Sequence, residues 1–315
     1  MQTLETAYGR IATTGVVERF PDGGVKSCTP AAETTLFTPL GAFVPQHTTD
    51  DLRRRTVQSL SFHANGALRH LPLEHPATVH TPAGQVTAEL LTFHPSGGLH
   101  RVFPLNGKLS GLWSEADEGA LARPVSLVTP LGPLTARFIG LSFAPGGELL
   151  SLTLWPGETL SVTTPVGPIE TRIGVSFRPD GSLRSLEPAR PQSVPTPAGK
   201  VLAYDPDAVG VCGDVNSLAF APDGGVERLS SSLTGIAAVR DDGAEIVADP
   251  EIRESICGDG EREVTPLRLR FGREMLSVQL RPESEWLNLP LTRWRVRARP
   301  FVAQFARPLV RACAC

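Results

Sequence analysis

Two short turn motifs alternate along most of the chain and limit what it can fold into. The first motif has an aromatic residue, two or three turn residues, a glycine and then an aliphatic stretch. Its six copies begin at Phe20, Phe62, Phe93, Phe143, Phe177 and Phe220. The second motif reads Thr-Pro-x-Gly, and its five copies begin at Thr38, Thr81, Thr129, Thr164 and Thr196. Because the copies follow one another in strict alternation, they predict a repeated structure.

Both motifs have the residues that tight β-hairpins require. In the copy at 177–183, Pro179 presets φ for a type I turn, and Gly181 can take the left-handed conformation that follows. The copy at 164–167 places proline and glycine by the same logic. In the flanking sequence, Val175 and Phe177 share one face of an extended chain and Ser176 the other. The pattern predicts an all-β chain of antiparallel strands joined by local hairpins.

Composition supports this prediction and excludes several classes of protein. The chain of 315 residues is 41% apolar, so it can bury a substantial core. Its 30 glycines and 29 prolines interrupt it too often for long helices. The net charge of −3 makes a globally basic nucleic-acid binder unlikely.

The termini and the cysteines indicate a cytoplasmic protein. The first fifteen residues lack the basic and apolar regions of a secretory signal, and no apolar run is long enough to span a bilayer. The cysteines are odd in number and form no CxxC pair, as in a chain that does not depend on disulfides. They are Cys28, Cys212, Cys257, Cys313 and Cys315.

The spacing of the motifs divides the chain into repeats, inserts and a C-terminal region. We predict a hairpin-repeat domain of about six units at 1–238 and a β-rich capping region at 239–315, where the motifs fade. Three longer units carry inserts at 46–56, 114–124 and 205–216. Insertions into repeat proteins often gather on the binding face. The inserts are therefore the first candidates for a specific binding surface.

One segment resembles a known repeat. Residues 93–114 are similar to the variant MORN repeat of YwqK-like bacterial proteins, with Asn106, Gly107, Lys108, Gly111 and Trp113 in its second half. In the other units Thr-Pro-x-Gly replaces that second half, so the resemblance is close only over this segment and architectural over 16–235. It implies an elongated, single-layered sheet of successive hairpins that serves as a scaffold or binding surface and not as an enzyme.

A β-propeller is the alternative fold. Residues 218–225 are similar to the Phe-Ser-Pro-Asp-Gly turn of propeller blades, and six units also suit a propeller. Against it, the unit from Phe62 to Phe93 leaves little room for four strands, and the Trp-Asp and Gly-His signatures are missing. We predict an antiparallel hairpin-repeat meander or solenoid of MORN-like type ahead of the propeller.

Candidate binding residues occur in three places. Trp113 is a possible stacking platform, although tryptophans of this kind are more often partly buried. The C-terminal arginines suggest a patch for RNA, anionic lipid or an acidic partner, but their alternation with Trp294 and Val296 favours a solvated strand face. The insert at 205–216 carries oxygen ligands whose spacing does not match an EF-hand loop. The insert and arginine candidates are Asp205, Asp207, Asp214, Asn216, Arg293, Arg295 and Arg297.

The sequence assigns no catalytic residue, metal or cofactor. It has no nucleophile elbow, P-loop, GxGxxG or HExxH motif. His63 and His94 occupy the same turn position, and His70 or His100 could complete a metal site. That position is filled variably in the other units, which favours an exposed turn without metal. Cys313 and Cys315 are interpreted as part of a frayed tail.

The sequence thus predicts a non-catalytic cytoplasmic repeat protein that presents an extended β surface to a protein partner, with a homodimer also possible. One alternative is an enzyme with a cleft between the repeat sheet and the C-terminal region, lined by residues 205–216. The other is a binder of anionic lipid or RNA through the arginine-rich C-terminus.

Overall fold

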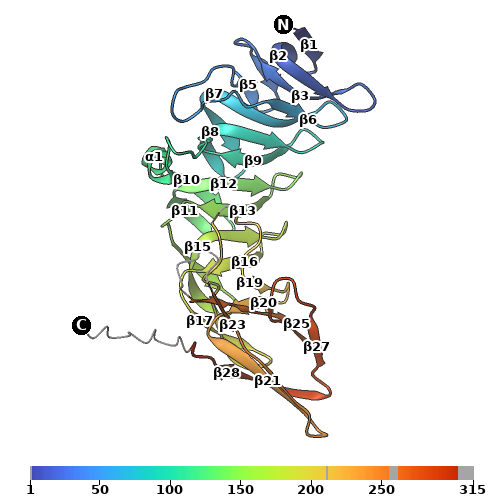
Figure 1. Cartoon of the computed structure of the whole chain (residues 1–315). Coiled ribbons are helices and arrows are strands. Elements are labelled where there is room, and N and C mark those ends of the chain that lie inside the picture. Colours follow the sequence, from blue (N-terminus) through green and yellow to red (C-terminus); the bar gives the residue numbers. More distant parts are fainter. Residues whose placement is uncertain (1, 211, 255–261, 304–315) are drawn as a thin grey trace, which may run out of the picture. The chain divides into compact units, whose positions relative to one another are not determined.

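The computed structural model describes residues 2–210, 212–254 and 262–303. These residues form antiparallel strands and one short helix, so the all-β prediction and its hairpin-rich character are confirmed (Figure 1). The chain divides into two compact units. Unit 1 comprises the described residues up to Val162 together with Arg172–Arg184 and Val209–Val215. Unit 2 comprises Thr163–Thr171, Ser185–Ala208 and the described residues from Asn216 onward. The two units are defined by the contacts within each of them, whereas the expected boundary at 238 lies where the sequence motifs end.

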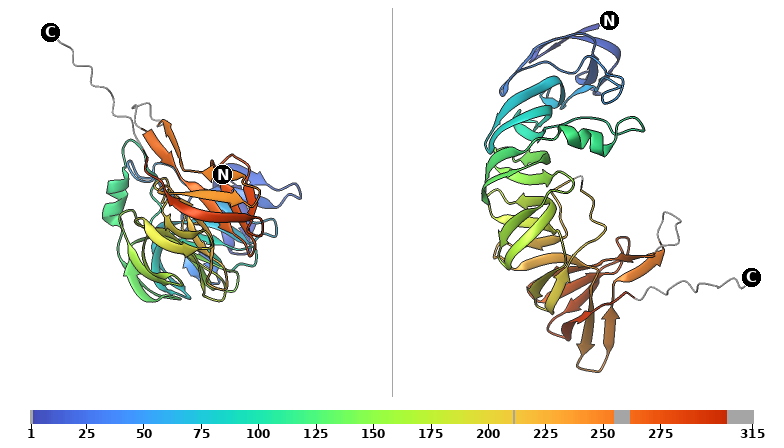
Figure 2. Two further views of the ribbon diagram at one scale, coloured as in Figure 1. Left: turned by 90° about the horizontal axis from the view of Figure 1, so that it is seen from below. Right: turned by 90° about the vertical axis from the view of Figure 1, so that its left-hand side faces the viewer.

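The main sheet of unit 1 is an antiparallel meander in which each strand pairs with the one before it (Figures 1 and 2). Its order is β1 (Gln2–Thr6), β2 (Gly9–Arg19), β3 (Val25–Pro30), β6 (Leu60–Phe62), β7 (Leu68–Thr81), β8 (Gly84–Phe93), β9 (Leu99–Phe103), β12 (Phe138–Phe143), β13 (Leu149–Leu154) and the Arg172–Phe177 part of β15 (Gly167–Phe177). The pairing of β9 with β12 continues the sheet across the insert at 114–124, which carries helix α1 (Glu115–Leu121).

Unit 2 contains a second antiparallel run and several smaller sheets. The run is β16 (Leu183–Pro188), β19 (Leu218–Phe220), β20 (Val226–Ser231), β25 (Leu267–Phe271), β26 (Met275–Gln279) and β27 (Leu287–Pro290). Strands β22 (Glu245–Ala248), β21 (Thr234–Arg240) and β28 (Trp294–Pro300) form a three-stranded sheet. Unit 2 also contains two separate hairpins: β17 (Gln192–Thr196) with β18 (Gly199–Ala203), and β23 (Glu251–Glu254) with β24 (Arg262–Thr265).

Each copy of the aromatic motif closes a hairpin with the same two backbone hydrogen bonds. At the second copy, the N–H of His63 donates to the carbonyl of Ala67 (2.8 Å) and the N–H of Gly66 to that of His63 (2.9 Å). Gly66 has φ 81°, the left-handed conformation expected for this glycine. A register shift marks each of these hairpins for which the pairing is given, as a bulge requires.

The first copy of this motif is offset by one residue from the others. Five of the six motif phenylalanines are buried: Phe62, Phe93, Phe143, Phe177 and Phe220. In the first hairpin the N–H of Phe20 donates to the carbonyl of Gly24, which is the bond made by His63 in the next hairpin. Phe20 therefore occupies the turn position and is partly exposed, and Arg19 takes the place of the buried phenylalanine.

The threonine of the second motif holds its turn together. Thr129 Oγ1 donates to the carbonyl of Gly132 (2.8 Å) and accepts the N–H of Leu131 (3.1 Å). The other four copies make the same pair of bonds. So does Thr6-Ala7-Tyr8-Gly9, a sixth copy that the sequence pattern missed because alanine replaces proline. The hydroxyl thus defines this turn more consistently than the proline does.

These threonine turns close a second set of hairpins. They join β4 (Leu36–Thr38) to β5 (Gly41–Phe43), the outer ends of β7 and β8, β10 (Val125–Thr129) to β11 (Gly132–Ala136), and β14 (Leu160–Thr164) to β15. Their buried side chains include Leu36, Val79, Val86 and Leu127. The sheet itself buries the leucines and valines on one of its faces, such as Leu91, Val102 and Leu141.

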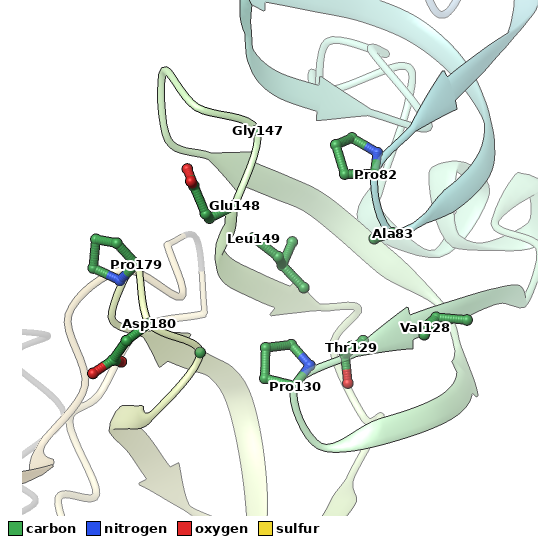
Figure 3. Close-up of a pocket in the computed structure, with 11 residues that line it drawn as sticks. Pro82, Ala83, Val128, Thr129, Pro130, Gly147, Glu148, Leu149, Pro179 and Asp180 are labelled. Carbon is green, nitrogen blue, oxygen red and sulfur yellow. The ribbon is translucent and has the colours of Figure 1, made fainter.

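The two motifs contact each other, which gives a physical reason for their alternation. A Cβ added to Gly147 would lie 3.3 Å from Cγ of Pro82, and one added to Gly181 would lie 3.6 Å from Cβ of Pro130. Gly224 approaches Pro165 in the same way in unit 2. The left-handed glycine of one motif is therefore seated against the proline of the other. Figure 3 shows the resulting seam in unit 1, a recess of about 300 Å³ lined by residues of four turns.

We expect Gly147→Ala to destabilise the protein more than Gly97→Ala. Both glycines have left-handed φ values, 96° and 84°, so each substitution strains the backbone by about 1–2 kcal/mol. At Gly147 the new methyl group would meet a neighbour, Pro82. At Gly97 no atom lies within 4 Å of the position of the new methyl group. Chemical denaturation measures the difference. In a protein that also carries Pro82→Ala, the difference between the two glycine substitutions should be smaller. Equal losses of stability at both glycines in the native protein would show that the contact with Pro82 does not matter.

Candidate binding site

The inserts at 46–56 and 114–124 are joined by one buried arginine. The guanidinium of Arg53 donates two hydrogen bonds to the carboxylate of Glu89 on β8 (3.0 and 2.6 Å) and two to that of Glu118 on α1 (both 2.7 Å). The Arg53 side chain is 14% exposed, and those of the two glutamates are 5% and 6% exposed. Each pair has the two-pronged geometry that makes arginine–carboxylate contacts strong and directional. The arginine thus fixes both inserts to the sheet.

The segment that resembles a MORN repeat completes this cluster. The backbone N–H of Asn106 donates to Glu89 (2.8 Å), and that of Gly107 donates to Glu118 (2.8 Å). The indole N–H of Trp113 also donates to Glu118 (2.7 Å). Trp113 therefore helps to position α1, and it is partly buried.

The start of α1 is determined by its own sequence. Ser114 is the N-cap, and its hydroxyl accepts the N–H of Asp117, whose carboxylate in turn accepts the N–H of Ser114. This reciprocal pair satisfies two backbone donors at the helix start. On the other side of the helix, a Cβ added to Gly119 would lie 3.1 Å from Nε1 of Trp155 on the sheet. The helix is thereby held close to β13.

The charges of the cluster stabilise one another. Burial alone would raise the pKa of Glu118. The hydrogen bonds from Arg53, Trp113 and Gly107 lower the pKa by more than burial raises it, so it lies below its ordinary value. Burial alone would lower the pKa of Arg53, and its bonds to the two glutamates raise it above the ordinary value. At neutral pH Arg53 and Glu118 are therefore both charged.

A third buried glutamate holds the beginning of the insert at 46–56. The carboxylate of Glu74 accepts the backbone N–H groups of His47 (2.8 Å) and Thr48 (3.1 Å) and the hydroxyl of Thr48. Arg54 donates to the backbone carbonyls of Leu73 and Glu74 at 3.1 Å. Two consecutive arginines of the insert, Arg53 and Arg54, are therefore engaged in hydrogen bonds within the protein.

The insert at 46–56 and the segment around Lys108 and Ser110, which precedes the insert at 114–124, line a cavity of about 290 Å³, which we call the cationic recess. It is lined by Leu52, Arg53, Arg55, Thr56, Lys108 and Ser110. The backbone N–H of Lys108 donates to the carbonyl of Arg53 (3.1 Å), which ties its two walls together. Arg55 and Lys108 are exposed, and neither forms an ion pair with any residue that the structure describes.

Three exposed leucines belong to the same segments. Leu52, Leu109 and Leu112 are 52%, 54% and 56% exposed. Leu52 lines the cationic recess, and Leu109 lies between two of its lining residues in sequence. Exposed apolar side chains are typical of interaction sites where they form one contiguous patch.

The third insert is divided between the two units. In unit 1, the carboxylate of Asp214 accepts hydrogen bonds from Arg101 and Ser151, and the N–H of Gly213 donates to Thr153 Oγ1 (2.8 Å). Burial raises the pKa of Asp214, and the bonds from Ser151 and Arg101 bring it below its ordinary value. Asp214 is thus paired with side chains of β9 and β13.

The remaining polar residues of this insert serve other contacts in unit 2. Asn216 Nδ2 donates to Ser185 Oγ (2.9 Å), Asp205 accepts the N–H of Asp207 (3.1 Å), and Asp207 lies 3.5 Å from Arg253. Ser217 donates through both its N–H and its hydroxyl to the buried carboxylate of Glu187. The predicted oxygen ligands therefore work as separate turn and packing groups.

The turn histidines link neighbouring hairpins. His63 Nε2 lies 2.9 Å from the carbonyl of Phe93, and His94 Nε2 lies 2.9 Å from that of Phe143. Since a carbonyl only accepts, both imidazoles carry a proton on Nε2. Within the described ranges, no group of three or more histidine, cysteine, aspartate or glutamate side chains is placed to hold a metal ion.

The C-terminal arginines lie on a solvated strand face of unit 2. Arg293, Arg295 and Arg297 are exposed, whereas Trp294 and Val296 between them are partly buried. Arg295 pairs with Asp241 (2.8 Å), and Arg299 pairs with Asp249 (2.7 Å). Arg307, Arg311, Cys313 and Cys315 lie outside the described residues.

Comparison with known proteins gives no relative. No family model, no curated protein and no solved structure matches this chain. In the part of the chain that the structure describes, no helix is long and apolar enough to cross a membrane.

We expect Arg53→Met to lower the free energy of unfolding by about 3–5 kcal/mol, because it leaves two buried carboxylates without their cation. Arg55→Met is the matched control: Arg55 is the neighbouring exposed arginine, and its loss should change stability by less than about 0.5 kcal/mol. Urea unfolding at neutral pH measures both values. A similar small effect of the two substitutions would contradict the role given to Arg53.

The pH dependence provides a separate test of the same cluster. Because the folded-state pKa of Glu118 is below its ordinary value, its contribution to stability is present at neutral pH and is lost as the pH falls through that folded pKa. In Arg53→Met, burial should raise this pKa, so the variant gains stability on acidification relative to the native protein. We expect the stability difference between the two to shrink from neutral to acidic pH, and a constant difference would argue against the pairing.

Proposed function

We propose that this chain is a non-catalytic hairpin-repeat protein of MORN-like architecture that binds a protein partner in the cytoplasm. The hydrogen-bonded succession of hairpins in unit 1 supports this architecture over a propeller, because propeller blades are separate four-stranded sheets. A long sheet with inserts on rigid hairpins suits a scaffold better than a reaction site.

The observation that carries the proposal is the rigid pair of inserts held by Arg53. Buried side chains with two-pronged hydrogen bonds hold the segments at 46–56 and 106–121 in one conformation. These segments present Leu52, Leu109 and Leu112 to solvent beside the cationic recess. A surface that is already ordered loses little conformational entropy when a partner binds.

The alternative functions receive less support from the contacts described. An RNA or lipid surface needs many free positive charges; of the C-terminal arginines, Arg295 and Arg299 are paired with aspartates, which leaves the exposed Arg293 and Arg297. For the enzyme alternative, the polar residues of the 205–216 insert are engaged in structural hydrogen bonds. A second copy of the chain is the other partner that the insert surface could accept.

A photocrosslinking amino acid placed at Leu112 tests the proposal in cells that naturally produce the protein. We expect a discrete adduct with one other protein or with a second copy. The matched control is the same amino acid at Val16, which is 84% exposed on β2 and belongs to no insert. Adducts of the same pattern from both positions, or none from Leu112, would refute the insert surface as the binding site.

A further inference from the structure

We propose that the cationic recess binds an acidic, leucine-rich or otherwise aliphatic segment of the protein partner. The proposal rests on the proposed function and names the chemistry of the partner at that surface. It follows from the charges that the fold leaves uncompensated there and from the apolar side chains beside them.

The first step is the balance of charge at the recess. The insert at 46–56 contains three consecutive arginines. Arg53 is neutralised by Glu89 and Glu118, and Arg54 is directed at backbone carbonyls with Glu74 at 3.9 Å. Arg55 remains, and Lys108 on the opposite wall is the second cation without a described carboxylate within ion-pair distance. The recess therefore has two uncompensated positive charges.

No acidic side chain in the described part of the chain forms an ion pair with Arg55 or Lys108. The carboxylate of Asp50 accepts the backbone N–H groups of Leu52, Arg53 and Arg54 (2.9, 2.5 and 2.8 Å), so it is directed into its own turn. The exposed Asp51 does not line the recess. A carboxylate from outside the chain would thus meet two cations together with the hydroxyls of Thr56 and Ser110.

The apolar surroundings select an acidic peptide rather than a polyanion. Leu52 lines the recess, and Leu109 and Leu112 extend the apolar surface along the same segment. RNA binding usually depends on many phosphate contacts and on free aromatic faces for stacking. Here there are two cations without a described ion pair, and the chain has a net charge of −3. A peptide in which carboxylates alternate with aliphatic side chains would match both the cations of the recess and the exposed leucines beside it.

The test uses the full chain and a displayed library of random peptides. We expect peptides captured by the native protein to be enriched in aspartate and glutamate next to leucine, isoleucine or valine. Binding of a captured peptide, measured by fluorescence anisotropy, should fall by about tenfold in Arg55→Glu/Lys108→Glu and weaken at high salt. It should fall similarly when asparagine and glutamine replace the acids in the peptide, which tests the charge without altering the protein.

Arg19→Glu/Arg69→Glu is the matched control, because it makes the same change in net charge at exposed arginines outside the recess. We expect it to retain binding. Three outcomes would overturn the proposal: captured peptides without an excess of acids, equal loss of binding in both double variants, or a labelled RNA oligonucleotide as the ligand that depends on Arg55 and Lys108. If crosslinks at Leu112 persist in any of these cases, the binding surface stands and only the acidic partner is refuted.

Discussion

The fold depends on how the left-handed glycine of one turn meets the proline of another. A side chain at Gly147 would crowd Pro82, and one at Gly181 would lie in contact with Pro130, so these hairpins approach their neighbours at a glycine in the left-handed conformation. The threonine hydroxyl keeps the proline turn closed from within, as at Thr129. Strand pairing alone would allow the hairpins to slide past one another, and these turn contacts fix their register.

This stacking also explains which parts of the chain are free to vary. The turn position after the buried phenylalanine accepts histidine, alanine or arginine, because it needs only its backbone N–H and carbonyl for the hairpin. His63 and His94 use the same position to bond the carbonyl of the next buried phenylalanine. Inserts are tolerated between hairpins because the edge of one hairpin can still pair with the next, as β9 does with β12.

The hairpins were predictable from the sequence because their signals are local. Proline, glycine and threonine act within four residues of one another, and alternating residues identify the buried face. The offset at Phe20 was also visible in the sequence, because Pro-Asp-Gly follows Phe20 directly but follows Phe177 after one more residue; the hydrogen bond from the N–H of Phe20 to Gly24 shows its structural consequence. The ion cluster was missed. Arg53 lies 36 residues from Glu89 and 65 from Glu118, so no local sequence pattern links the three.

The ion cluster gives the resemblance at residues 93–114 a physical meaning. One arginine and two glutamates leave the buried site with an excess negative charge, and such a site is stable only if further donors are present. Asn106, Gly107 and Trp113 supply those donors, two from the backbone and one from the indole. A buried ion pair contributes little net stability compared with apolar packing of the same volume, but it tolerates few alternative geometries. Its main consequence is therefore positional, since it sets where the exposed leucines and Lys108 of the adjoining segment stand.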